Sequence, residues 1–336
     1  MDFLQRRKDY DPQNFYQVLV DFPLQFQKAY EYVDNSGCHL DLPQDNALSK
    51  VLVCGMGGSS LPTDIINNLV FDDCFLHVCR DYDVPDWVDE DTLIFVNSYS
   101  GNTEETLDAL EMIRKKTKYI VIITAGGILE AKANEYNIPY YTIPLGQQPR
   151  AMTGYFIVYM LHVLFEYGFI EDMKSKMLSL ISRLQEYDYH TQAQDIVERI
   201  ANKLPIIYTS DRCSSVARIW KIKINENAKT QCFWNVFPEL NHNEMVGFTA
   251  LRVEPFFILL KSDLDNERVQ KRMQIFSDIL SQKSYIYQVQ MKGDSLLEQI
   301  FSALLLGDWV SYYLALSQQV DPTPVDMVED FKQRMK

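Results

Sequence analysis

Residues 97–106, Asn-Ser-Tyr-Ser-Gly-Asn-Thr-Glu-Glu-Thr, lie between a predicted strand and a predicted helix. The apolar run before them, residues 93–96, is typical of a buried parallel strand. Leu107, Leu110 and Ile113 follow at three-residue spacing, so they share one face of a helix. The chain therefore runs from a strand through a hydroxyl-rich turn into a helix.

This turn is a candidate phosphate site. Its three hydroxyl groups belong to Ser98, Ser100 and Thr103. Gly101 allows the backbone to bend tightly, and the free N–H groups of the helix start attract anions. An alternative needs no ligand, because Asn102 as N-cap with Glu105 three residues later resembles a capping box. Both alternatives remain open on this turn alone.

A second turn of the same kind follows the predicted strand at residues 51–54. Residues 55–60 read Gly-Met-Gly-Gly-Ser-Ser and precede a helical pattern. A phosphosugar loop would use these glycines, Gly57 and Gly58 included, with Ser59 as a donor. A dinucleotide loop is an alternative, with Asp81 as the ribose acid, although Ser60 occupies the third glycine position. A tight packing turn without a ligand is the third possibility.

The alternation of strands and helices predicts the fold. Further strands are expected at residues 75–79, 119–124, 140–143, 205–208, 256–260 and 285–289. We expect two doubly wound parallel-sheet α/β domains that face each other across a cleft. The expected parts are an N-terminal domain with a leading helix, a helical connector, and a C-terminal domain with a last helix: residues 1–168, 169–202 and 203–336.

Composition narrows the function. The net charge of −14 argues against nucleic acid and anionic membranes as partners. The six cysteines lack zinc-ligand spacing, so no metal is expected. The N-terminus has no apolar signal core, and the runs 155–165 and 301–316 are read as buried helices rather than membrane spans. A cytoplasmic location follows as an expectation.

Three further residues are candidates for chemistry. Arg150 lies at a helix start, against the dipole preference, which suggests that it neutralises an anion. Glu226 lies near a helix end among asparagines and lysines, and His242 follows sixteen residues later in a polar turn. The alternatives are a solvated helix end, a solvated carboxylate and a histidine that bonds to backbone.

Five motifs, in this order, resemble the bifunctional phosphoglucose/phosphomannose isomerases, which contain two sugar-isomerase (SIS) domains. They are Gly-Met-Gly-Gly-Ser-Ser (55–60), Ser-Tyr-Ser-Gly-Asn-Thr-Glu-Glu-Thr (98–106), Pro-Arg-Ala (149–151), Asn-Glu-Asn-Ala-Lys (225–229) and Pro-Glu-Leu-Asn-His-Asn-Glu (238–244). The phosphate loop is common to all SIS proteins. The last two motifs are far more specific, and the resemblance covers the chain from about residue 51 onward.

The resemblance implies a role for each candidate. The sugar phosphate would be held by Ser59, Ser98, Ser100 and Thr103. Arg150 would stabilise the enediolate, Glu226 would be the base, and His242 would open the sugar ring from the partner subunit of a homodimer. Lys332, after Thr323-Pro-Val325, is taken as the family's lysine in the last helix, and Thr323 as a weaker sugar contact.

The implied reaction interconverts glucose 6-phosphate and fructose 6-phosphate, with mannose 6-phosphate as a further substrate, and needs neither metal nor cofactor. A carboxylate shuttles the proton between neighbouring carbons, and a cation stabilises the enediolate. The main alternative is a phosphosugar-binding regulator that does no chemistry. The presence of both Glu226 and His242 argues against a regulator, which would need neither.

Overall fold

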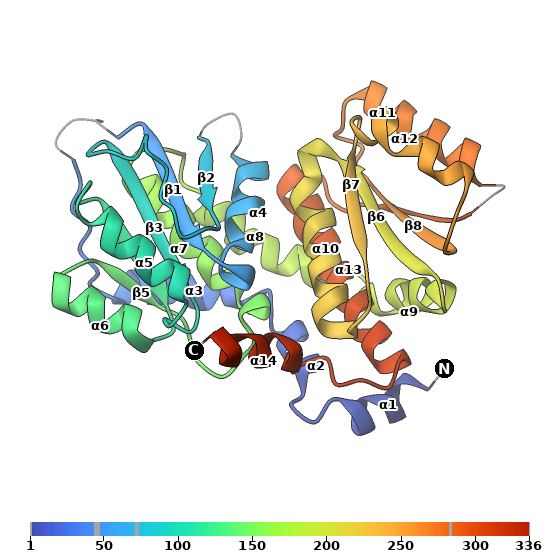
Figure 1. Ribbon diagram of the computed structural model, residues 1–336, viewed down its shortest axis with the longest axis horizontal. Coiled ribbons are helices and arrows are strands. Elements are labelled where there is room, and N and C mark those ends of the chain that lie inside the picture. The colour runs from blue at the N-terminus through green and yellow to red at the C-terminus, as the bar shows by residue number, and fades with distance from the viewer. Residues whose placement is uncertain (1, 44–47, 71–73, 282–283, 336) are drawn as a thin grey trace. The chain divides into compact units, whose positions relative to one another are not determined.

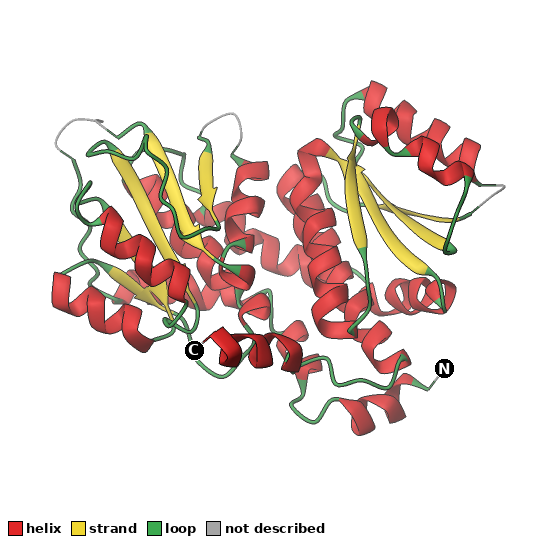
Figure 2. Cartoon of the chain, in the orientation of Figure 1, coloured by secondary structure: helices red, strands yellow, loops and turns green. Residues whose placement is uncertain are grey.

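The computed structural model describes residues 2–43, 48–70, 74–281 and 284–335 (Figure 1). It contains two compact units, each built on one parallel sheet with helices around it (Figure 2). The first-sheet unit is Asp21–Gln185, and the second-sheet unit is Met1–Val20 together with Glu186–Lys336. The predicted class of two parallel-sheet α/β domains is therefore confirmed.

These compact units divide the chain differently from the expected parts. Helix α8 (Lys174–Gln185) belongs to the first-sheet unit, where it packs against α3 (Leu24–Asn35). Helix α9 (Tyr189–Ile200) belongs to the second-sheet unit, because its apolar face packs against α13 (Leu296–Ser317). The expected connector is thus split between the units. The bounds of independently folding domains stay a prediction, and their ends, residues 1 and 336, lie outside the described residues.

The first sheet has five parallel strands in the order β2-β1-β3-β4-β5. They are β1 (Lys50–Gly55), β2 (Leu76–Cys79), β3 (Thr92–Ser98), β4 (Ile120–Thr124) and β5 (Tyr140–Thr142). Apolar residues fill β1, β3 and β4 because both faces of the sheet are buried. Since β2 and β3 lie on opposite sides of β1, the strand order reverses between β1 and β3. The carboxyl ends of these two strands form the switch point where ligands bind in such sheets.

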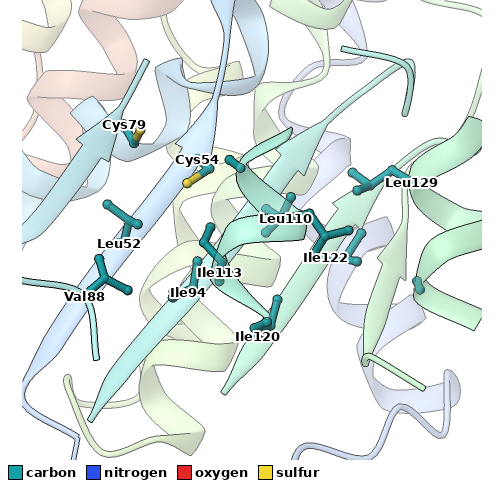
Figure 3. Packing of buried hydrophobic residues seen from close by; sticks show 13 residues of the cluster. Leu52, Cys54, Cys79, Val88, Ile94, Leu110, Ile113, Ile120, Ile122 and Leu129 are labelled. Carbon is teal, nitrogen blue, oxygen red and sulfur yellow. The ribbon is translucent and has the colours of Figure 1, made fainter. Parts of the chain in front are cut away.

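Helices cover this sheet and complete its core. One face packs against α5 (Glu104–Ile113) and α6 (Gly127–Tyr136), as Figure 3 shows for the buried cluster that includes Leu52, Ile94 and Leu110. Helix α7 (Thr153–Glu166) packs against α3 and α4 (Leu61–Leu69). Pro23 lies between α2 (Phe15–Val20) and α3, where it precedes the first residue of α3.

The second sheet has four parallel strands in the order β7-β6-β8-β9. They are β6 (Leu204–Ser210), β7 (Phe233–Phe237), β8 (Pro255–Lys261) and β9 (Tyr285–Gln290). Strand β7 was not expected from the sequence. The helices of this unit include α10 (Ser214–Ala228), α11 (Leu240–Asn243), α12 (Glu267–Leu280), α13 and α14 (Asp326–Met335). The order reverses between β6 and β8, which gives this unit a switch point as well.

The first 20 residues belong to the second-sheet unit through contacts with its last long helix. Helix α1 (Phe3–Tyr10) places Arg6 so that Nη1 donates to the carbonyl of Leu316 at 2.8 Å. The hydroxyl of Tyr312 donates to Oδ2 of Asp11 at 2.9 Å. The leading segment and α13 therefore pack into one core.

Helix α13 is buried, as expected from the sequence. Among the described helices it alone is long and apolar enough to cross a membrane. In the structure 94% of its most apolar window is covered by the rest of the chain. Its composition is therefore that of a core helix, packed against α9 and α10.

Candidate active site

The hydroxyl-rich turn lies at the switch point of the first sheet, where β3 ends. The Ser98 and Thr103 hydroxyls lie 2.9 Å apart, and the N–H of Gly101 donates to Oγ of Ser98 at 3.1 Å. Ser100 is exposed, and its Oγ accepts from the N–H of Asn102 at 3.2 Å. The three hydroxyls therefore gather beside the first turn of α5.

The capping-box alternative for this turn is wrong. Helix α5 begins at Glu104 after Thr103 as N-cap, and no side chain accepts a hydrogen bond there. Asn102 instead directs Oδ1 to the N–H of Ile128, at 3.1 Å. The side chain of Asn102 thus joins two loops, and the first-turn N–H groups of α5 have no side-chain cap.

Gly101 is required by the close approach of a neighbouring loop. Its φ of +67° is a left-handed conformation that favours glycine, and a Cβ there would lie 1.7 Å from the carbonyl oxygen of Gly126. The turn after β3 therefore packs directly on the turn after β4. A side chain at this position would push the hydroxyl loop out of place.

The second predicted loop lies beside the first one. Residues Gly57–Ser59 form a short 3₁₀ helix after β1, and Ser59 is buried. Its Oγ accepts from the N–H of Tyr99 at 3.0 Å, which joins the ends of β1 and β3. Ser59 therefore shares one site with the hydroxyls of the 98–103 turn.

Arg150 is brought to the same edge by a 3₁₀ turn, Pro149–Ala151. The backbone of this turn lies against Gly58, where a Cβ would be 2.7 Å from the N–H nitrogen of Arg150. The Arg150 side chain is 1% exposed, and Nη1 donates to Oε1 of Gln148 at 3.1 Å. The backbone of Arg150 thus lies against the Gly58 turn, and its buried guanidinium is a group of the kind that binds anionic ligands.

Tyr99 is a site residue that the sequence reasoning missed. Its hydroxyl donates to the carbonyl of Pro144 at 2.9 Å and accepts from the N–H of Gln147 at 3.2 Å. Burial raises the pKa of Tyr99. Its place between two serines of the turn was the only available signal. Tyr99 ties the phosphate-loop candidate to the segment that carries Arg150.

In the second-sheet unit, Glu226 and Thr323 lie near one another. Glu226 is on the last turn of α10 and partly exposed, and Lys229 ends this helix with φ +55°. Nζ of Lys229 donates to the carbonyls of Glu226, at 2.7 Å, and Pro322, at 3.3 Å. Thr323 is buried, and its N–H donates to Asp321. Lys229 therefore connects the helix end to the loop after α13.

His242 does not join Glu226 within the unit. Helix α10 follows the carboxyl end of β6 and returns to the start of β7 (Figure 1). Glu226, on the last turn of α10, therefore lies toward the amino edge of the sheet. His242 is exposed on the short helix α11, beyond the carboxyl end of β7. The five residues of β7 span roughly 13 Å between these two edges.

The segment of His242 is anchored by Glu244. The Tyr208 hydroxyl and the Asn235 amide both donate to the carboxylate of Glu244. Burial, and then the bond to Glu244, raise the pKa of Tyr208. These contacts hold the segment of α11 on the sheet, while the side chain of His242 stays exposed.

Lys332 lies on α14, whose side chains are exposed along most of the described length. Its Nζ is paired with Oε1 of Glu329 at 2.7 Å, and the Lys332 side chain is 61% exposed. Val325 precedes the helix and is half-buried. Within the described residues, no group of three His, Cys, Asp or Glu side chains is arranged to hold a metal ion.

Comparisons with known proteins identify the family of this chain. Residues 189–335 match the family model described as the bacterial phospho-glucose isomerase C-terminal SIS domain. A bifunctional phosphoglucose/phosphomannose isomerase from Caldicellulosiruptor bescii is 36% identical over 95% of this chain and 98% of the relative. The chain belongs to the bifunctional phosphoglucose/phosphomannose isomerase family. The resemblance expected from the sequence is thereby confirmed.

Two more comparisons support the family and the fold. The protein of the same name from Thermoplasma acidophilum is 33% identical over 85% of this chain and 90% of its own length. The solved structure of a hypothetical protein from Thermus thermophilus has a TM-score of 0.74 at 15% identity, covering 94% of this chain and 88% of that one. Family membership favours the phosphosugar alternative for residues 55–60 over the dinucleotide alternative.

Proposed function

We propose that this chain interconverts glucose 6-phosphate and fructose 6-phosphate, and also accepts mannose 6-phosphate, through a cis-enediolate. The observation that carries the proposal is the hydroxyl cluster at the β1/β3 switch point, beside the buried Arg150. The substrate phosphate is held by Ser59, Ser98, Ser100 and Thr103, with Gly57 and Gly58 allowing close approach. Neutral donors and the start of α5 hold the phosphate without a metal.

Glu226 acts as the base in this proposal. Isomerisation removes a proton next to a carbonyl and returns it to the neighbouring carbon, which a partly exposed carboxylate can do. Arg150 stabilises the charge that develops on the enediolate oxygen. Thr323 contacts the sugar and Lys332 supplies a second cation. The chemistry needs no cofactor, and the six free cysteines fit a cytoplasmic location.

His242 serves the active site of a partner subunit in a homodimer. Its separation from Glu226 by the length of β7 supports this assignment. Apolar side chains near His242 are exposed, as surfaces that dock a second chain often are. They are Val246 at 77%, Leu251 at 40% and Val253 at 57%.

The decisive experiment on the chemistry uses Glu226→Gln, with Glu171→Gln, an exposed carboxylate in a loop, as the matched control. Glu226→Gln keeps the shape of the side chain, so KM for fructose 6-phosphate should change little while kcat falls about 10²-fold or more. Exchange of the C2 proton with solvent should disappear in parallel. If the variant exchanges that proton at the wild-type rate, another residue is the base. If wild-type protein binds hexose 6-phosphates without turnover, the regulator alternative holds.

The shared site is tested with two inactive proteins, Glu226→Gln and His242→Ala, unfolded and refolded together. Random pairing puts about half of the dimers in the mixed class, and one site in each mixed dimer is intact. Activity should then return to roughly a quarter of the wild-type value. If mass spectrometry shows that mixed dimers form and the mixture nevertheless stays inactive, His242 acts within its own subunit.

A further inference from the structure

Helices α10 and α13 are joined by a buried polar seam, which we define as three side-chain links along their contact. The links are Trp220 to Ala303, Lys223 to Asp308 and Asn227 to Ser311. On α10 they lie three and four residues apart, so they share one helix face. The last of them is adjacent to Glu226. The seam therefore runs from the middle of α10 to the proposed base.

The first link brings the helices close together. Nε1 of Trp220 donates to the carbonyl of Ala303 at 2.7 Å. Gly307 makes room for the indole, because a Cβ there would lie 2.5 Å from Nε1. The indole lies directly on the backbone of α13. This contact fixes the position of α10 along the axis of α13.

The middle link is a buried ion pair. Lys223 and Asp308 are each 4% exposed on their side chains, and Nζ of Lys223 donates to Oδ1 of Asp308. Such a pair contributes little net stability, since apolar replacements of similar size are often as stable. Its directional bonds instead select one arrangement of the two helices, as buried polar groups do in coiled coils.

The third link acts directly beside the base. Nδ2 of Asn227 donates to Oγ of Ser311 at 2.9 Å, and that hydroxyl donates to the carbonyl of Asp308 at 2.8 Å. Asn227 and Ser311 are fully buried, whereas Glu226, one residue earlier, reaches the surface. The orientation of the last turn of α10, and hence of the Glu226 carboxylate, is set by this bond.

We propose that Lys223 and Asn227, with Asp308 and Ser311, are positioning residues that hold Glu226 in register for proton transfer. Residues after α13 lead to the loop of Thr323, which Lys229 joins to the end of α10. The seam therefore fixes the base relative to the sugar-contact loop as well. This inference rests on the proposed role of Glu226. It holds that the buried polar links serve the rate of proton transfer rather than the stability of the fold.

The test separates stability from rate by replacing the ion pair with apolar residues. Lys223→Met alone leaves Asp308 buried without its cation and should lower Tm. Lys223→Met/Asp308→Leu should restore Tm to near the wild-type value, while kcat stays about 10-fold or more below it, with little change in KM. Recovery of both Tm and wild-type kcat in the double variant would overturn the proposal.

The third link provides an independent test on a single atom. Ser311→Ala should lower kcat, and Ser311→Thr, which keeps the hydroxyl, should rescue it. The matched control is Ser302→Ala on the same helix, whose buried hydroxyl donates to the carbonyl of Lys292 at 2.7 Å. If Ser302→Ala and Ser311→Ala change Tm and kcat alike, the seam is structural only.

A double-mutant cycle distinguishes failure of this inference from failure of the proposed function. Combined with Glu226→Gln, the apolar double variant should lose no further activity, because the seam acts through that carboxylate. An additional 10-fold loss in the triple variant would show that the seam acts elsewhere. Wild-type kcat in Glu226→Gln alone would instead remove the base assignment.

Discussion

The two sheets of this chain have the same kind of switch point but different side chains there. At the ends of β1 and β3, serine and threonine hydroxyls meet glycine-rich turns. At the ends of β6 and β8, the Ser210 hydroxyl donates to Oδ1 of the buried Asp265 at 2.7 Å. Ser262 donates to Gln299, which in turn donates to Asp263. The second switch point thus carries carboxylates in the place where the first switch point carries hydroxyls.

This difference shows that topology supplies a location and side chains decide its use. Both locations gather strand ends and helix starts, as doubly wound sheets do. Asp263 and Asp265 would repel a phosphate, and burial raises the pKa of Asp265 against the opposing effect of its bond with Ser210. The second switch point therefore uses its polar side chains to hold its own strands together, whereas in our proposal the first binds the substrate phosphate.

The strongest test of the difference between the two switch points is to introduce a carboxylate at the first one. Ser100→Asp places a carboxylate on an exposed turn position, so folding should be unaffected. Repulsion from the substrate phosphate should raise KM by up to about 10³-fold, since unit charges a few ångströms apart near a surface interact by about 4 kcal/mol and each 1.4 kcal/mol is a factor of ten. Steady-state kinetics with fructose 6-phosphate measure this. Ser100→Ala is the control, and an equal KM in both variants would place the phosphate elsewhere.

Replacing a glycine at the first switch point should have a smaller effect than Ser100→Asp, and this effect should be on stability rather than on KM. Gly101→Ala combines a left-handed φ with a Cβ that meets the carbonyl of Gly126, so the free energy of unfolding should fall by about 2 kcal/mol or more. Gly37→Ala has a similar φ of +60° with open space around the Cβ, and should cost about 1 kcal/mol. Urea titrations compare the two variants. Equal losses would show that the packing of the two turns contributes nothing.

The smallest expected effect comes from the second switch point. Because burial raises the pKa of Asp265, the folded protein binds more protons than the unfolded chain between the ordinary and the raised pKa. Stability from this carboxyl therefore falls as pH rises through that window. Asp265→Asn lacks this titration, so its Tm relative to that of the wild type should increase as the pH rises from about 3.5 to about 7. A difference that does not change with pH would contradict this.

Much of the first sheet could be predicted from the sequence because its strands are continuous apolar runs. The run 93–96 and the hydroxyl turn after it lie where the pattern placed them. Strand β7 was missed because it is an edge strand whose residues are mostly half-exposed. Its sequence therefore lacks a clear pattern of apolar residues. The capping-box alternative was wrong because Asn102 bonds across to Ile128, which no local spacing reveals.

The site was harder to predict wherever distant residues meet. Asp308 lies within the run 301–316 that was expected to be a buried helix, and its partner is Lys223, 85 residues away. Glu226 and His242 are only sixteen residues apart in the sequence, yet β7 separates them toward opposite edges of the sheet, a distance that the spacing alone does not reveal. Pairings of this kind depend on the register of packed elements, which sequence patterns leave open.

The packing of residues 1–20 on α13 has a consequence for synthesis of the chain. Arg6 is translated before its acceptor Leu316, which follows 310 residues later in the chain. The first-sheet unit, Asp21–Gln185, lies between them in sequence and can fold while the second is still being translated. The leading segment must wait for α13, with the apolar face that includes Phe3 and Phe15 uncovered until then. Docking of the leading segment on α13 can thus take place only after residue 316 has been translated.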